Sequence, residues 1–126
     1  MSPYSPRIAD METREDFLEH LWDYYFNSYM HEDWIDKEIK FSRRHPDAPF
    51  ADVEPVLMRL IGLGATRRDI SLLARWAAYN GVFSAYHALD ENPGIEGHDI
   101  RGLAESLLSA DPSGLEGRPG SAPEKN

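Results

Sequence analysis

The sequence of 126 residues predicts an all-α protein, a compact bundle of about five helices around a central apolar helix at about 66–89. Apolar residues recur at the three- and four-residue spacing of amphipathic helices through most of the chain. Residues 66–89 have few polar positions, which is typical of a helix packed on all sides. Beyond Asp111 the periodicity ends and Pro, Gly and Ser dominate. We therefore expect one helical domain at 1–110 and a flexible C-terminal tail at 111–126.

The first two helices are predicted from their start signals. Thr13 and Asp16 have the spacing of a capping box, so a first helix should cover about residues 14–30. Its apolar face would consist of Phe17, Leu18, Leu21, Trp22, Tyr25, Phe26 and Tyr29. Asp33 should cap a second helix that ends before Pro46. The inward-facing side chains of this second helix would be Trp34, Ile35, Ile39 and Phe41.

Two further helices are expected before and after the glycines Gly62 and Gly64. Asp52 would cap the third helix, and the glycines would end it. The predicted buried face of this helix contains Val56, Leu57, Leu60 and Ile61. Thr66, with Asp69 three residues later, would cap the fourth and most apolar helix.

A last short helix is expected to begin at Asp99 and to bury Leu103, Leu107 and Leu108. The stretch Gly102–Pro119, with the sequence GLAESLLSADPSGLEGRP, resembles the end of a group of small, acidic, uncharacterised bacterial proteins. The resemblance covers only this C-terminal stretch. It implies no activity, so it assigns no functional residue.

The net charge of −9 is concentrated near the N-terminus. Residues 10–38 hold ten carboxylates against two basic side chains, which gives this segment a charge of −8. Such a field repels nucleic acid and steers basic partners toward the protein. The chain has no run of about 18 apolar residues that could span a bilayer, and residues 1–11 lack the apolar core of a signal peptide. We therefore expect a cytoplasmic protein that does not contact a membrane.

Motifs that would indicate catalysis are absent from the sequence. There is no cysteine and no Gly-x-Ser-x-Gly elbow, so we predict neither an enzyme nor a bound cofactor. One metal-binding alternative remains open. Asp16, His20 and Asp23 are spaced so that they share one face of the first helix, where such ligands can converge on a metal ion. A metal-dependent enzyme that uses these three side chains is the third functional hypothesis.

The segment 57–76 resembles the helix-turn-helix of bacterial repressors, because Gly64 lies in a short turn and Thr66 opens the next helix. The resemblance implies that a DNA major groove would be faced by Arg67, Arg68, Ser71 and Arg75. The positive start of this helix would also suit an anion, with Arg67, Arg68 and Arg75 as ligands. The negative net charge and the apolar remainder of the helix oppose nucleic-acid binding. A DNA-binding regulator is therefore the alternative hypothesis.

The first helix mixes aromatic rings with carboxylates, which is typical of protein interfaces. Aromatic side chains contribute much of the binding energy, and acidic ones steer a basic partner. Tyr24 and Tyr25 cannot both lie on one buried stripe, so at least one of them should be exposed. We predict a protein–protein interaction module, such as an inhibitor, immunity-type protein or adaptor, that binds a basic surface or forms a homodimer. The predicted contact residues are Asp16, Glu19, Asp23, Tyr24, Tyr25 and Trp34.

Overall fold

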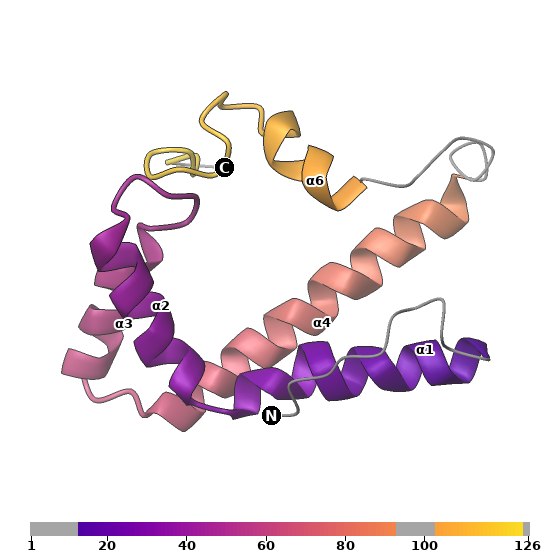
Figure 1. Ribbon diagram of the computed structural model, residues 1–126, viewed down its shortest axis with the longest axis horizontal. Helices are drawn as coiled ribbons and strands as arrows, with labels where there is room; N and C mark the ends of the chain where they lie inside the picture. The colour runs from indigo at the N-terminus through magenta and orange to yellow at the C-terminus, as the bar shows by residue number, and fades with distance from the viewer. Residues whose placement is uncertain (1–12, 93–102, 125–126) are drawn as a thin grey trace.

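The computed structural model describes residues 13–92 and 103–124, and all regular structure in these residues is helical (Figure 1). The elements are α1 (Arg14–His20), the π-helical η2 (Leu21–Phe26), the 3-10 turn η3 (Asn27–Met30), α2 (Asp33–Arg44), α3 (Val53–Gly62), α4 (Arg67–Glu91), α6 (Leu103–Leu107) and the 3-10 turn η4 (Leu108–Ala110). The all-α prediction is confirmed. Among these elements, none is long and apolar enough to cross a membrane.

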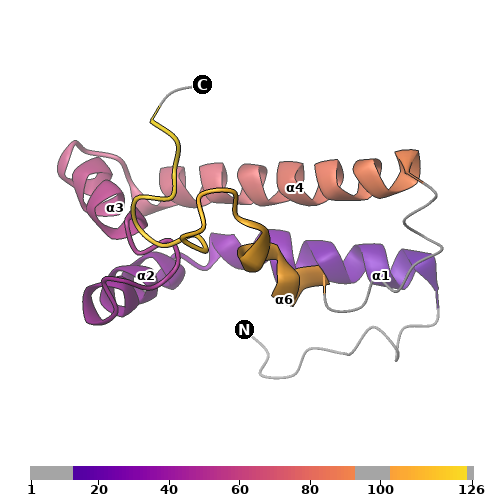
Figure 2. The same cartoon turned by 90° about the horizontal axis from the view of Figure 1, so that it is seen from above.

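The helices form an open arch (Figures 1 and 2). α1, η2 and η3 follow one another as a rod, and α4 runs back beside this rod. α2 and α3 pack together at the end where α4 begins. α6 and the C-terminal segment lie across the arch from α4, next to the loop between α2 and α3 (Figure 1). The expected cap of α6, Asp99, lies outside the described residues.

The predicted first helix is continuous over residues 14–30, but its middle is a π-helical turn. Thr13 caps its start, since the Asp16 amide donates to the Thr13 hydroxyl at 3.0 Å. In the turn η2 the hydrogen bonds reach one residue further than in an α-helix, which changes the spacing of side chains on each face. Leu21 and Phe26, five residues apart, are therefore both buried. Both residues belong to the predicted apolar face, whereas Leu18, Trp22 and Tyr25 of that face are exposed.

The main core lies where α2 and α3 meet the start of α4. It consists of Ile35, Ile39, Leu57 and Ile70, with Trp34, Ile61 and Ala65 packed against it. Other side chains expected inside are exposed, because each helix packs through a narrow stripe only. Phe41 of α2 is 52% exposed, and Val56 and Leu60 of α3 are also exposed, so the inward orientation predicted for these three is wrong.

α4 begins as predicted but is not a central helix. The Thr66 hydroxyl accepts from the Asp69 amide at 3.0 Å, and the Asp69 carboxylate accepts from the Thr66 amide at 3.3 Å, which completes the capping box. Beyond its first turns, however, α4 packs against η2 and η3 on one side only. Trp76 is 65% exposed and Phe83 is 55% exposed. The prediction of a helix covered on all sides is wrong, because these large side chains of α4 are exposed.

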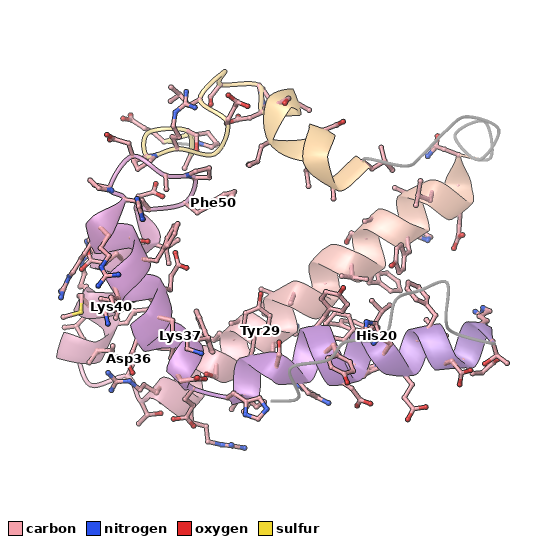
Figure 3. All side chains as sticks on the ribbon, in the orientation of Figure 1. His20, Tyr29, Asp36, Lys37, Lys40 and Phe50 are labelled. Atoms are coloured by element: carbon pink, nitrogen blue, oxygen red, sulfur yellow. The ribbon has the colours of Figure 1, made fainter. Side chains whose placement is uncertain are left out.

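The C-terminal segment is held by a local hydrogen-bond network, so the predicted flexible tail is not confirmed for residues 111–124. The Asp111 carboxylate accepts from the Gly117 amide at 2.8 Å and from the Ser113 amide at 2.9 Å. These bonds, with that of the Ser113 hydroxyl, hold the pKa of Asp111 below its usual range. Phe50, in the loop between α2 and α3 (Figure 3), donates its amide to the Gly117 carbonyl at 2.7 Å.

Candidate functional site

A groove of about 240 Å³ lies between the first helical rod and the C-terminal half of α4. α4 contacts the η2 and η3 parts of the rod. Apolar side chains of α4 and of the rod remain exposed beside this contact. Most of the lining is aromatic or aliphatic, with two titratable groups at one end. The lining residues are Leu18, Leu21, Trp22, Phe26, Tyr79, Val82, Phe83, Tyr86, His87 and Asp90.

The rings in this groove contact one another in a row. Trp22 packs against Tyr79 with ring centroids 5.7 Å apart, and Tyr79 stacks on Phe83 at 6.1 Å. Phe83 in turn stacks on His87 at 5.8 Å. Mutual ring contacts restrict these side chains, so the side chains themselves would lose little conformational entropy when a partner binds. We call Trp22, Trp76, Tyr79, Phe83 and Tyr86 the aromatic face.

The two ends of the aromatic face differ in charge. At one end the Arg75 guanidinium lies 5.3 Å from the centroid of the Trp22 ring and donates to the Asn27 side chain at 2.8 Å. At the other end are Asp90 and the ion pair of His87 with Glu91, whose atoms are 2.8 Å apart. Burial, followed by the nearby Tyr25 hydroxyl, raises the pKa of Tyr86 above its usual range. The face is thus apolar in the middle, basic at one end and acidic at the other.

The acidic residues predicted as partner contacts lie on the outside of the rod. Asp16, Glu19 and Asp23 are all exposed. Glu19 and Asp23 follow the groove residues Leu18 and Trp22 in the sequence, but neither carboxylate lines the groove. Of the two tyrosines, Tyr25 is exposed and Tyr24 is half-buried, with its ring 4.6 Å from that of His20. The expectation that at least one tyrosine lies outside the core is confirmed.

Trp34 takes part in the internal structure rather than in the candidate surface. Its indole N–H donates to the Tyr29 carbonyl at 2.9 Å and to the Ser71 hydroxyl at 3.0 Å. These bonds connect η3, α2 and α4, and they satisfy the hydroxyl of the fully buried Ser71. The sequence analysis placed Trp34 among the partner contacts and Trp22 on the apolar face of the first helix, because the contact between Trp34 and α4 has no local signal in the sequence.

The arginines of the DNA-binding and anion-binding hypotheses do not form one open basic surface. Arg67 pairs with Asp36 of α2 at 2.8 Å, and this contact raises the pKa of the guanidinium. Arg75 is directed to Asn27 and the Trp22 ring, whereas Arg68 is exposed at the start of α4. Ser71, which a DNA-reading helix would present to the DNA major groove, is fully buried. Its assignment to a DNA-facing surface is therefore wrong.

The residues of the metal hypothesis do not converge either. His20 is buried beside the rings of Tyr24 and Tyr25, while Asp16 and Asp23 point to solvent. Within residues 13–92 and 103–124, no three His, Asp or Glu side chains are grouped so that they could hold a metal ion. Asp16 and His20 lie in α1 but Asp23 lies in the π-helical η2, so the α-helical spacing assumed for the three does not extend to Asp23.

The residues of α4 that form most of the aromatic face were assigned to the core by sequence reasoning. A signal for them was present, because Leu72, Trp76, Tyr79, Phe83 and Tyr86 recur at alternating intervals of four and three residues. This spacing is typical of one seam between two helices rather than of a helix covered all round. Comparisons with protein-family models, with curated proteins and with solved structures found no match.

Proposed function

We propose that this protein is a protein–protein interaction module whose binding surface is the aromatic face between the first rod and α4. The observation that carries the proposal is the groove itself, where exposed, mutually packed rings adjoin a small core. Clusters of exposed aromatic side chains are a common feature of interface hot spots. An inhibitor, an immunity-type protein or an adaptor would work through such a surface.

The chemistry of the groove favours an amphipathic helix as the bound element. Two antiparallel helices with a depression between them accept a third helix through apolar side chains at three- and four-residue spacing. One carboxylate, that of Asp90 on α4, lines the groove, and the rod beside it carries the exposed carboxylates of Asp16, Glu19 and Asp23. A partner helix with a basic flank would therefore be attracted and oriented. These features support the proposed basic partner.

A synthetic helix of leucine and lysine, labelled with a fluorophore, tests the proposal by fluorescence anisotropy. We expect it to bind the protein, and we expect Phe83→Asp to weaken binding by at least about tenfold because a carboxylate replaces an anchor ring. A leucine–glutamate helix of the same length should bind more weakly, because Asp90 and the acidic side chains exposed on the rod repel its charges.

The matched control is Leu63→Asp, since Leu63 is 79% exposed in the turn between α3 and α4 and does not line the groove. This variant should bind the basic helix with unchanged affinity. Equal weakening by both substitutions, or wild-type affinity of Phe83→Asp, would contradict the proposed surface. Equal binding of the basic and acidic helices would contradict the proposed charge of the partner.

A further inference from the structure

The exposed apolar stripe of α4 has the spacing of a helix–helix seam. Leu72, Trp76, Tyr79, Phe83 and Tyr86 are all exposed, and Asp90 continues the same alternation of four and three residues. From Leu72 to Asp90 the intervals read the same in both directions, with their midpoint at Gly81. A stripe with this symmetry matches an inverted copy of itself, as the interface of a twofold dimer requires.

The charges at the two ends of the stripe also match those of an inverted copy, because one end is basic and the other is acidic. The first half of α4 holds Arg67, Arg68 and Arg75 against Asp69, whereas Asp90 and Glu91 end the helix, and no Asp, Glu, Lys or Arg lies between Arg75 and Asp90. The start of the rod lies at this acidic end, because Phe17 contacts Tyr86 with ring centroids 6.4 Å apart, and its charged side chains are Arg14, Glu15, Asp16 and Glu19. The molecule therefore has a basic end and an acidic end along one apolar surface.

We infer that the occupant of the aromatic face is a second copy of this chain, with the two α4 helices antiparallel about a twofold axis near Gly81. This inference rests on the proposed function and names its partner. The basic side chains that face the acidic end of one copy are then Arg68 and Arg75 of the second copy. Because Asp90 lies opposite Leu72 in this arrangement, it falls between those two arginines.

The antiparallel orientation follows from charge and from ring packing together. In a parallel pair, Asp90 and Glu91 would face their own copies, and the like charges would oppose association. In the antiparallel pair, Trp76 meets Tyr86 of the second copy, and Tyr79 meets its Phe83. Each of these ring pairs occurs twice, once on either side of the twofold axis. Leu18 and Trp22 of each rod, which line the same groove, extend the contact.

Sedimentation equilibrium of the full chain over a range of concentrations tests this dimer. We expect a monomer–dimer equilibrium that weakens at high salt, because the charged ends are exposed to solvent. Arg68→Glu and Asp90→Arg should each weaken the dimer by about tenfold, and the double variant should restore most of the loss. Asp47→Arg, a charge reversal in the exposed loop between α2 and α3, should leave the equilibrium unchanged.

Phe83→Asp should leave only monomer while retaining the helical circular dichroism of the wild type, and Trp76→Gln provides a second variant on the same face. A dimer that persists in both variants would overturn the inference. So would a double charge variant that is no tighter than the single ones. If the wild type stays monomeric but still binds the basic helix through Phe83, the second copy is excluded while the proposed function stands. If neither the dimer nor the helix depends on Phe83, both proposals fail.

Discussion

Gly117 sets how closely the C-terminal segment approaches the loop between α2 and α3. Its φ of +75° lies in the left-handed region, and an added Cβ would lie 3.1 Å from the side chains of Leu108 and Phe50. Gly117 therefore meets two requirements at once, a backbone angle that other residues adopt at a cost and a close contact in which an added methyl group would displace the side chains of Leu108 and Phe50. Composition alone identified this segment only as rich in glycine and proline.

We predict that Gly117→Ala loosens the C-terminal segment more than Gly114→Ala does. Both glycines have positive φ, but an added Cβ at Gly114 meets nothing within 4 Å. The two variants thus share the backbone strain, of about 1–2 kcal/mol, and differ in crowding. Hydrogen exchange at the Phe50 amide, which donates to the Gly117 carbonyl, measures the difference. Equal exchange rates in the two variants would show that crowding at Gly117 has no effect.

Single residues also show why part of the candidate site could not be predicted. Trp22 and Trp34 both lie on predicted amphipathic helices, yet Trp22 is exposed in the groove and Trp34 bonds to Ser71, which is far away in the sequence. The difference depends on a contact between α2 and α4. Local patterns contain no information about such a contact, so the sequence could not show which tryptophan is available to a partner.

The helices themselves were largely predictable, because their signals are local. The capping box of Thr66 and Asp69 marks the start of α4, and the rod over residues 14–30 begins after Thr13 as expected. The π-turn at Leu21–Phe26 was not predictable from apolar spacing. The faces of α4 were misassigned because hydrophobicity shows that a side chain favours burial, but not whether this chain or another one covers it.

Thr66→Ala should destabilise the protein by about 1 kcal/mol, because α4 loses the hydroxyl that accepts from the Asp69 amide. Thr66→Ser keeps this acceptor and should cost only a few tenths of a kcal/mol. Urea denaturation followed by circular dichroism gives both values. If the serine variant loses as much stability as the alanine variant, the methyl group rather than the cap is responsible.

At the scale of the whole molecule, the arch has a small core and a long exposed apolar surface. In the described residues the buried hydrophobic side chains are Leu21, Phe26, Ile35, Ile39, Ala51, Leu57 and Ile70. More large hydrophobic side chains are exposed than buried, and those on α4 and the rod are contiguous. Soluble monomers rarely leave such a surface uncovered, which is why a contact between chains is central to this account.

The three tryptophans allow that contact to be measured in one experiment. Trp22 and Trp76 lie on the aromatic face, while the Trp34 indole N–H is already bonded to Tyr29 and Ser71. The indole N–H resonances can be followed by NMR as the protein concentration rises, and then as the basic leucine–lysine helix is added. Our account predicts that the Trp22 and Trp76 resonances shift or broaden while that of Trp34 stays in place. It is contradicted if Trp22 and Trp76 stay unchanged under both conditions, or if Trp34 alone responds.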